Sequence, residues 1–209
     1  MRLYLGLYLI DMIDVAHLHP LIVPREYIES GSWDLPHVAL PNQAFILTWV
    51  SYGEVMVYLD RAEFDELESS GHPWQRQALE NVRQTKYFQR YHQHDADGKL
   101  AWVAFVNDDD TISSSKVLLA HELSQLFPEG YHLAIPDRAC GVVVSNACSD
   151  DALREVVRMI EQMHDGANTP MSPQLYPATD FQLPTKWTIP DPGADISAAI
   201  VDQFRQSGL

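Results

Sequence analysis

A strand, a turn and a second strand near the middle of the chain constrain the fold most. Apolar and polar residues alternate over Tyr131–Ile135, as in a strand with one solvent-exposed face. Gly141–Ser145 is a nearly continuous apolar run, as in a strand covered on both faces. Pro136 opens the turn between them, where its fixed φ suits a turn and its missing N–H suits a strand end. The pattern predicts an antiparallel hairpin.

Helices are expected on both sides of this hairpin. Apolar residues recur at helical spacing between Ile112 and Phe127, and Pro128 ends that pattern. Ser149 caps a second helix, whose acidic first turn suits the positive end of the helix dipole and which ends at Gly166. The second of these helices has the cleanest apolar periodicity in the chain.

Two more hairpins and two short helices are expected before residue 107. The predicted strands are residues 44–50, 54–59, 87–92 and 100–106, with turns at Ser51-Tyr52-Gly53 and Asp97-Gly98, and the predicted helices are Asp60–Glu68 and Trp74–Thr85. This mixture predicts an α+β fold with a mixed, largely antiparallel sheet packed against helices. A length of 209 residues fits one domain over residues 1–209.

Two proline-rich stretches interrupt the regular patterns. Residues 17–43 are expected to form a connection with a short helical turn near Glu26–Glu29, and residues 169–192 an extended arm with a strand near Thr179–Leu183. Trp33 and Trp187 either pin these stretches to the body or line a binding surface, and we favour pinning. At the ends of the chain, residues 2–15 favour a strand and residues 196–204 a closing helix.

Composition excludes several classes of function. The chain has 14 basic and 29 acidic residues, a net charge of -15, which repels nucleic-acid phosphates and anionic membranes. The apolar N-terminal stretch is interrupted by Asp11 and Asp14, so we expect neither a signal peptide nor a membrane span, and instead a soluble cytoplasmic protein. Cys140 and Cys148 are too few for a disulfide scaffold, and we favour two buried reduced thiols over a bridge.

The order of several short motifs resembles the YtpQ-like family of bacterial proteins, a domain of unknown function. The motifs are Val57-Tyr58-Leu59-Asp60-Arg61, Gln77-Ala78-Leu79-Glu80-Asn81, Ser113-Ser114-Ser115-Lys116-Val117-Leu118-Leu119, Leu133-Ala134-Ile135-Pro136-Asp137-Arg138 and Met171-Ser172-Pro173-Gln174-Leu175-Tyr176. The stretch from the first motif to the last spans a little over half of the chain. The sequence departs from the family at Ala139, where an acidic residue usually follows the arginine. The resemblance implies a fold and a bacterial cytoplasmic origin, and it carries no established activity.

The turn of the central hairpin is the first candidate site. Arg138 could bind a carboxylate or phosphate through its planar fork, with Asp137 beside it and His132 on the facing strand. A surface ion pair with local carboxylates is the alternative that we favour, because such pairs are common. Cys140 and His132 could also form a nucleophile–base pair, although a core thiol is the favoured role of Cys140.

The candidate metal ligands are incomplete. On a strand, His92 and His94 point to the same face beside Asp95, but zinc needs three or four ligands, and we expect no metal and no cofactor. His121-Glu122 lacks the second histidine of a zinc-protease helix, which leaves Glu122 as a solvated helix residue. The acidic run at residues 107–110 is expected to be a solvated turn rather than a calcium loop.

These observations leave two hypotheses for function. We favour a non-enzymatic binding or protein-interaction module, whose partner is another protein or a second copy in a homodimer. The alternative is a small-molecule hydrolase with a site near Arg138, which requires a pocket that joins this arginine to a histidine and a carboxylate.

Overall fold

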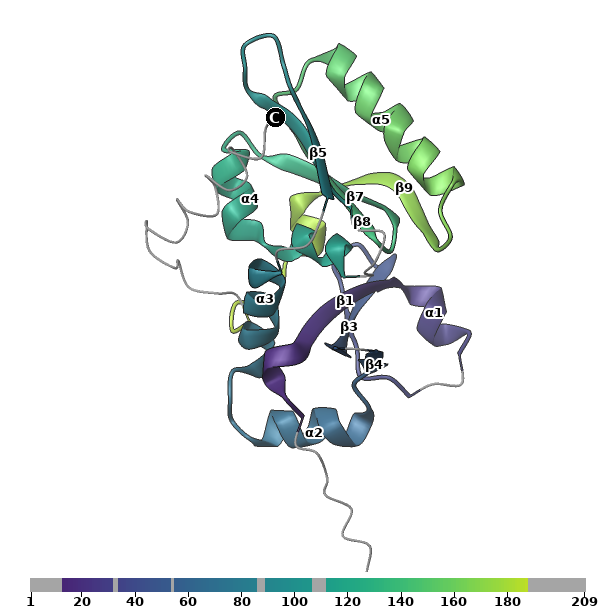
Figure 1. The fold of residues 1–209 in the computed structure, drawn as a ribbon, viewed down its shortest axis with the longest axis vertical. Helices are drawn as coiled ribbons and strands as arrows, with labels where there is room; N and C mark the ends of the chain where they lie inside the picture. Colours follow the sequence, from purple (N-terminus) through teal and green to yellow (C-terminus); the bar gives the residue numbers. More distant parts are fainter. Residues whose placement is uncertain (1–12, 32–33, 54, 86–88, 107–111, 188–209) are drawn as a thin grey trace, which may run out of the picture.

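The computed structural model describes residues 13–31, 34–53, 55–85, 89–106 and 112–187, and it has an α+β fold with two antiparallel sheets (Figure 1). The α-helices are α1 (Arg25–Glu29), α2 (Arg61–Ser69), α3 (Trp74–Gln84), α4 (Ala120–Leu126) and α5 (Asp150–Asp165). The strands are β1 (Leu18–Pro24), β2 (Val38–Ala39), β3 (Phe45–Tyr52), β4 (Met56–Tyr58), β5 (Gln89–His94), β6 (Leu100–Val106), β7 (Tyr131–Asp137), β8 (Cys140–Ser145) and β9 (Pro170–Pro177). Three 3-10 helices, η1 (Val15–His17), η2 (Ser113–Leu118) and η3 (Ala178–Phe181), complete the described elements. The predicted fold class is confirmed.

The first sheet is built around β3. Strand β1 pairs with one side of β3, and β2 and β4 pair with the other side. The predicted β3–β4 hairpin is confirmed, since Tyr52 is opposite Met56. The prediction of an irregular connection over residues 17–43 is wrong for β1, although α1 forms where a helical turn was expected. Pro20 and Pro24 are tolerated because β1 is an edge strand, where a missing N–H costs no hydrogen bond in the ladder.

The second sheet has the strand order β5-β6-β8-β7-β9, and all of its pairs are antiparallel. Both hairpins predicted in this part of the chain are confirmed, and the β5–β6 turn uses Gly98 at φ 75°. The proline-rich arm differs from the prediction, because its strand is the edge strand β9 rather than residues Thr179–Leu183. Most of the latter stretch belongs to η3.

The predicted continuous helix before the central hairpin is wrong. It divides into η2 and α4, with Leu119 between them at φ -81° and ψ 63°. Strand β8 packs against η2 so closely that a Cβ on Gly141 would lie 2.7 Å from Val117 Cγ1. The buried η2 can therefore pack this closely against β8 because residue 141 is a glycine and has no side chain.

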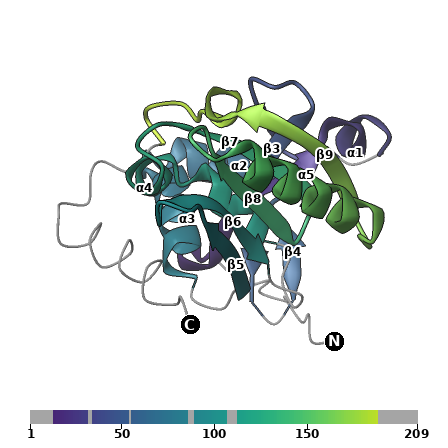
Figure 2. The same cartoon turned by 90° about the horizontal axis from the view of Figure 1, so that it is seen from above.

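The helices cover the sheets as their apolar faces predict. Helix α2 begins with a capping box between Asp60 and Glu63, and α5 begins with Ser149 accepting from the Ala152 N–H. Val156 and Ile160 of α5 pack against the second sheet, and Figure 2 shows this helix lying across the sheet. In the described part of the chain, no helix has the length and apolar character needed to cross a bilayer.

The largest core cluster contains residues from both sheets. Phe45 and Trp49 come from the first sheet, and Phe105 and Val143 from the second. Trp187 is 6% exposed and its ring lies 5.7 Å from that of Trp49, so this part of the C-terminal arm is pinned to the body, as favoured. Trp33, the expected strand over residues 2–15 up to residue 12, the acidic run 107–110 and the expected helix 196–204 lie outside the described residues.

Candidate functional site

The β7–β8 turn holds the candidate pair Asp137 and Arg138. The Asp137 carboxylate accepts hydrogen bonds from the backbone N–H of Ala139 at 2.7 Å and of Thr169 at 3.3 Å. The N–H of Arg138 donates to the carbonyl of Thr169 at 3.3 Å. Asp137 therefore holds the turn against the start of β9 and is occupied with backbone donors.

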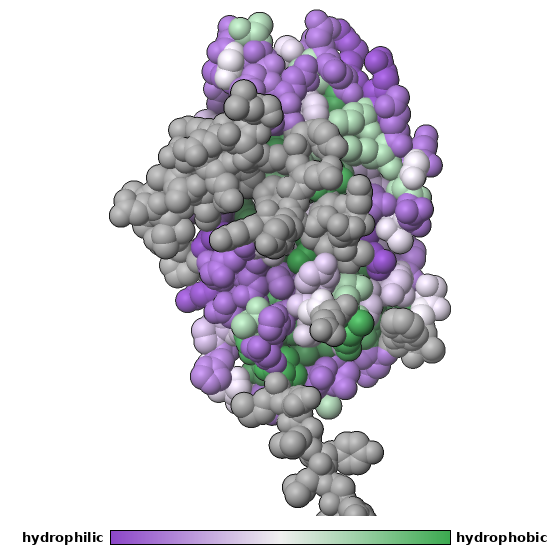
Figure 3. Space-filling model, in the orientation of Figure 1, coloured by the Kyte–Doolittle hydropathy of each residue, from purple (hydrophilic) through white to green (hydrophobic). Residues whose placement is uncertain are grey.

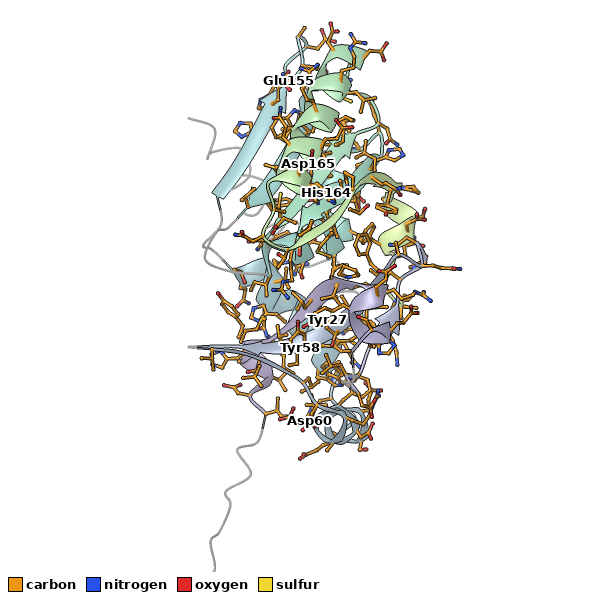
Figure 4. All side chains as sticks on the ribbon, turned by 90° about the vertical axis from the view of Figure 1, so that its right-hand side faces the viewer. Tyr27, Tyr58, Asp60, Glu155, His164 and Asp165 are labelled. Atoms are coloured by element: carbon orange, nitrogen blue, oxygen red, sulfur yellow. The ribbon has the colours of Figure 1, made fainter. Side chains whose placement is uncertain are left out.

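Arg138 reaches across to the first sheet. Its guanidinium lies close enough to the Tyr58 hydroxyl to act on the pKa of that group. The Tyr58 hydroxyl donates a hydrogen bond to the Tyr27 hydroxyl at 3.4 Å, and Figure 4 labels both tyrosines. Burial and the contact with Tyr27 raise the pKa of Tyr58, and the positive charge of Arg138 opposes that rise. No ion pair joins Arg138 to a carboxylate in the described residues, and its Nε is buried without a hydrogen-bond partner. The contact with Tyr58 links the two sheets.

His132 lies at the other end of β7. Its Nδ1 is 2.7 Å from the Asn146 side-chain oxygen, close to where Tyr131 pairs with Ser145. Six residues of extended chain separate it from Arg138, roughly 20 Å. The hairpin therefore does not bring these two candidates together, and neither of the two pockets described below contains Arg138.

Neither cysteine forms a disulfide. Cys140 is buried opposite Asp137, whereas His132 is opposite Val144, so no Cys–His pair forms on this hairpin. Burial raises the pKa of Cys140 to about 12, which leaves it a thiol at neutral pH.

The two histidines of β5 lie close together. The rings of His92 and His94 are 5.3 Å apart, with a register shift before His94. The described ranges contain no group of three or more histidine, cysteine, aspartate or glutamate residues placed to hold a metal. The His121 ring lies 3.0 Å from the Gln125 amide nitrogen.

Glu122 differs from the prediction of a solvated helix residue. It is 1% exposed, and its carboxylate accepts a hydrogen bond from Arg83 Nε, which joins α4 to α3. Arg83 also bonds Glu80 at 2.7 Å. Sequence reasoning missed this burial because the partner lies 39 residues away and has no local signal.

A pocket between η1 and the α2–α3 pair is the feature most like a binding site. It has a volume of about 850 Å³, and its apolar walls come from η1, the end of α2 and the start of α3. The lining residues are Ile13, Val15, Ala16, Glu66, Leu67, Ser70, His72, Pro73, Trp74, Arg76, Gln77 and Glu80. Figure 3 shows apolar surface in the lower part of the molecule, surrounded by polar residues.

Sequence reasoning did not find this pocket, because its walls come from segments far apart in the chain. The local signal was the break at Gly71-His72-Pro73, which indicates a corner between two amphipathic helices without showing what lies opposite. A second pocket of about 340 Å³ lies near the β5–β6 turn, where the Lys99 and Glu129 side chains form an ion pair at 3.1 Å. It is the smaller and more polar of the two.

The polar groups of the larger pocket differ in their hydrogen bonding. Ser70 donates its hydroxyl hydrogen to the Leu67 carbonyl at 2.7 Å and accepts from the His72 N–H at 3.1 Å. Arg76 forms no side-chain hydrogen bond or ion pair with the described residues, and its Nε is buried. The pocket thus combines apolar walls with one arginine that has no partner in the part of the chain that the structure describes.

No known protein family, no curated protein and no solved structure matches this chain. The resemblance to the YtpQ-like family therefore stays a proposal drawn from short motifs and their order.

Proposed function

We propose that this protein is a non-enzymatic binding module whose ligand occupies the pocket between η1 and α2–α3. The observation that carries the proposal is the pocket itself. Its volume of about 850 Å³ falls within the roughly 300–1,000 Å³ of small-molecule sites, and its lining is mainly apolar with a few polar groups, as such sites are.

The chemistry of the lining supports binding rather than hydrolysis. The Ser70 hydroxyl directs its hydrogen to a backbone carbonyl and not to a base, so it is not arranged as an activated nucleophile. The hydrolase hypothesis needed a histidine beside Arg138, and His132 lies at the far end of the hairpin. We also propose a bacterial cytoplasmic location, which the family resemblance and the two free cysteines support.

The test is a fluorescence titration with N-phenyl-1-naphthylamine, a neutral apolar probe. We expect the wild-type protein to bind one equivalent and to protect it from water. Ala16→Trp places a large ring in the pocket from an exposed position and should weaken binding at least tenfold. Ala62→Trp is the matched control, because Ala62 is equally exposed on α2 but does not line the pocket.

Two results would overturn the proposal. One is the absence of probe binding by the folded wild-type protein. The other is equal binding by Ala16→Trp and Ala62→Trp, which would place the probe elsewhere. Binding of the probe with the expected loss in Ala16→Trp alone would establish the pocket as the site.

A further inference from the structure

We infer that the pocket between η1 and α2–α3 selects a ligand with a monoanionic head group, a carboxylate, which Arg76 binds, and an apolar body. This inference rests on the proposed function and names the class of its ligand. It starts from the Arg76 side chain, which lines the pocket and forms no hydrogen bond or ion pair with the described residues. A charged donor at a pocket wall without a protein partner favours a ligand that carries an acceptor.

The carboxylate nearest in sequence is already committed. Glu80 stands one helical turn after Arg76 on α3, but its oxygens accept hydrogen bonds from Arg83 at 2.7 Å and from Gln84 at 3.1 Å. No ion pair within 4.0 Å joins Arg76 to any carboxylate of the described residues. In a protein with a net charge of -15, this arginine at the wall of a pocket has no counterion among the described residues.

The shape of the guanidinium selects a planar anion. A guanidinium offers pairs of N–H groups along its edges, a geometry that a carboxylate accepts as two parallel hydrogen bonds. Glu66 and Glu80 also line the pocket. Their negative charge penalises a second charge on the ligand, so a carboxylate is favoured over a phosphate dianion.

The rest of the lining sets the body of the ligand. Ile13, Val15, Leu67 and Trp74 offer aliphatic and aromatic walls with no charge. A chain or ring of apolar carbon that leaves water for these walls supplies most of the affinity, and Arg76 supplies the selection among head groups.

The experiment measures displacement of N-phenyl-1-naphthylamine by four compounds that share one octyl chain: octanoate, octan-1-ol, octyl phosphate and octyltrimethylammonium. We expect octanoate to displace the probe at a concentration about tenfold lower than octan-1-ol does, with the other two weaker than octanoate. Arg76→Met should remove the preference for octanoate while octan-1-ol still displaces the probe.

Arg25→Met is the matched control. Arg25 Nε is also buried without a hydrogen-bond partner, but this residue lies on α1 outside the pocket lining, so its substitution should keep the tenfold preference. If the probe does not bind to the wild-type protein, the proposed function itself fails. If the probe binds but octan-1-ol, octyl phosphate or octyltrimethylammonium displaces it as well as octanoate does, the pocket stands and the carboxylate assignment is wrong. Retention of the octanoate preference in Arg76→Met would refute the role of Arg76 alone.

Discussion

At the scale of single residues, the two cysteines occupy different environments. Cys140 is buried with its sulfur 3.7 Å from that of Met163, and burial followed by the charge of Asp137 raises its pKa to about 12. Cys148 is half-buried, and burial followed by the charge of Asp150 raises its pKa as well. Since the thiolate is the reactive form, both exposure and ionisation favour reaction at Cys148.

We therefore expect iodoacetamide to modify Cys148 of the native protein at pH 8 at least tenfold faster than Cys140. Peptide mass spectrometry after timed quenching measures both rates in one sample. Equal rates in native protein would contradict the burial of Cys140, and equal rates in urea serve as the control.

The raised pKa of Cys140 also predicts how stability depends on pH. The unfolded thiol ionises near pH 9 and the folded one only near pH 12, so the unfolded state loses its proton first and the free energy of unfolding falls as pH rises. When the pH rises from 8 to 10, the free energy of unfolding should fall in both proteins. We expect this fall to be about 1–2 kcal/mol smaller in Cys140→Ala than in wild type. Urea unfolding at both pH values measures this, with Cys148→Ala as the comparison, because the half-buried Cys148 should have the smaller effect. A parallel loss in wild type and Cys140→Ala would contradict it.

Some roles of single residues were predictable and others were not. The caps Asp60 and Ser149 were visible because a capping side chain bonds an N–H two or three positions later. The burial of Glu122 and the position of Arg76 at the wall of a pocket were not predictable. Whether a charged helical side chain is solvated depends on the segment that packs over it, and these segments are distant in sequence.

At the scale of elements, a buried ion pair joins α3 to α4. The side chains of Arg83 and Glu122 are only 4% and 2% exposed. Arg83→Met should cost about 3–5 kcal/mol, because it leaves a buried carboxylate without a counterion. Arg83→Met combined with Glu122→Leu should recover most of this loss, since neither charge then remains.

Urea unfolding of the single and double variants measures these differences. Lys99→Met is the control, because it breaks the well-exposed pair with Glu129 and should cost no more than about 1 kcal/mol. A loss below about 1 kcal/mol for Arg83→Met would show that Glu122 is solvated after all.

Elements with a local signal were predicted, and those defined by their neighbours were not. The β7–β8 hairpin and α5 follow from turn residues and apolar period alone. Strands β1 and β9 were missed because their prolines indicate irregular chain, and only the sheet order shows that both are edge strands. The division between η2 and α4 accompanies close packing at Gly141, another contact with a distant segment.

At the scale of the whole molecule, one apolar core lies between the two sheets. Trp187 packs on Trp49 of the first sheet, in the same cluster as Val143 of β8 in the second. A shared core couples the sheets, because neither can expose its inner face without removing apolar contacts from the other. The single domain stays a prediction, and the cooperativity of unfolding tests it.

Native-state hydrogen exchange distinguishes one cooperative unit from two. If the sheets unfold together, Trp187→Ala, which truncates a buried ring, should lower the opening free energy of β3 and β8 amides by the same amount, about 3–5 kcal/mol. Two independent units would lose protection in β3 alone, since Trp187 lies against Trp49 of that strand. Unchanged protection in β8 would therefore contradict the shared core. The η1, α2 and α3 walls of the pocket would then unfold separately from the second sheet, and ligand binding would stabilise the first sheet alone.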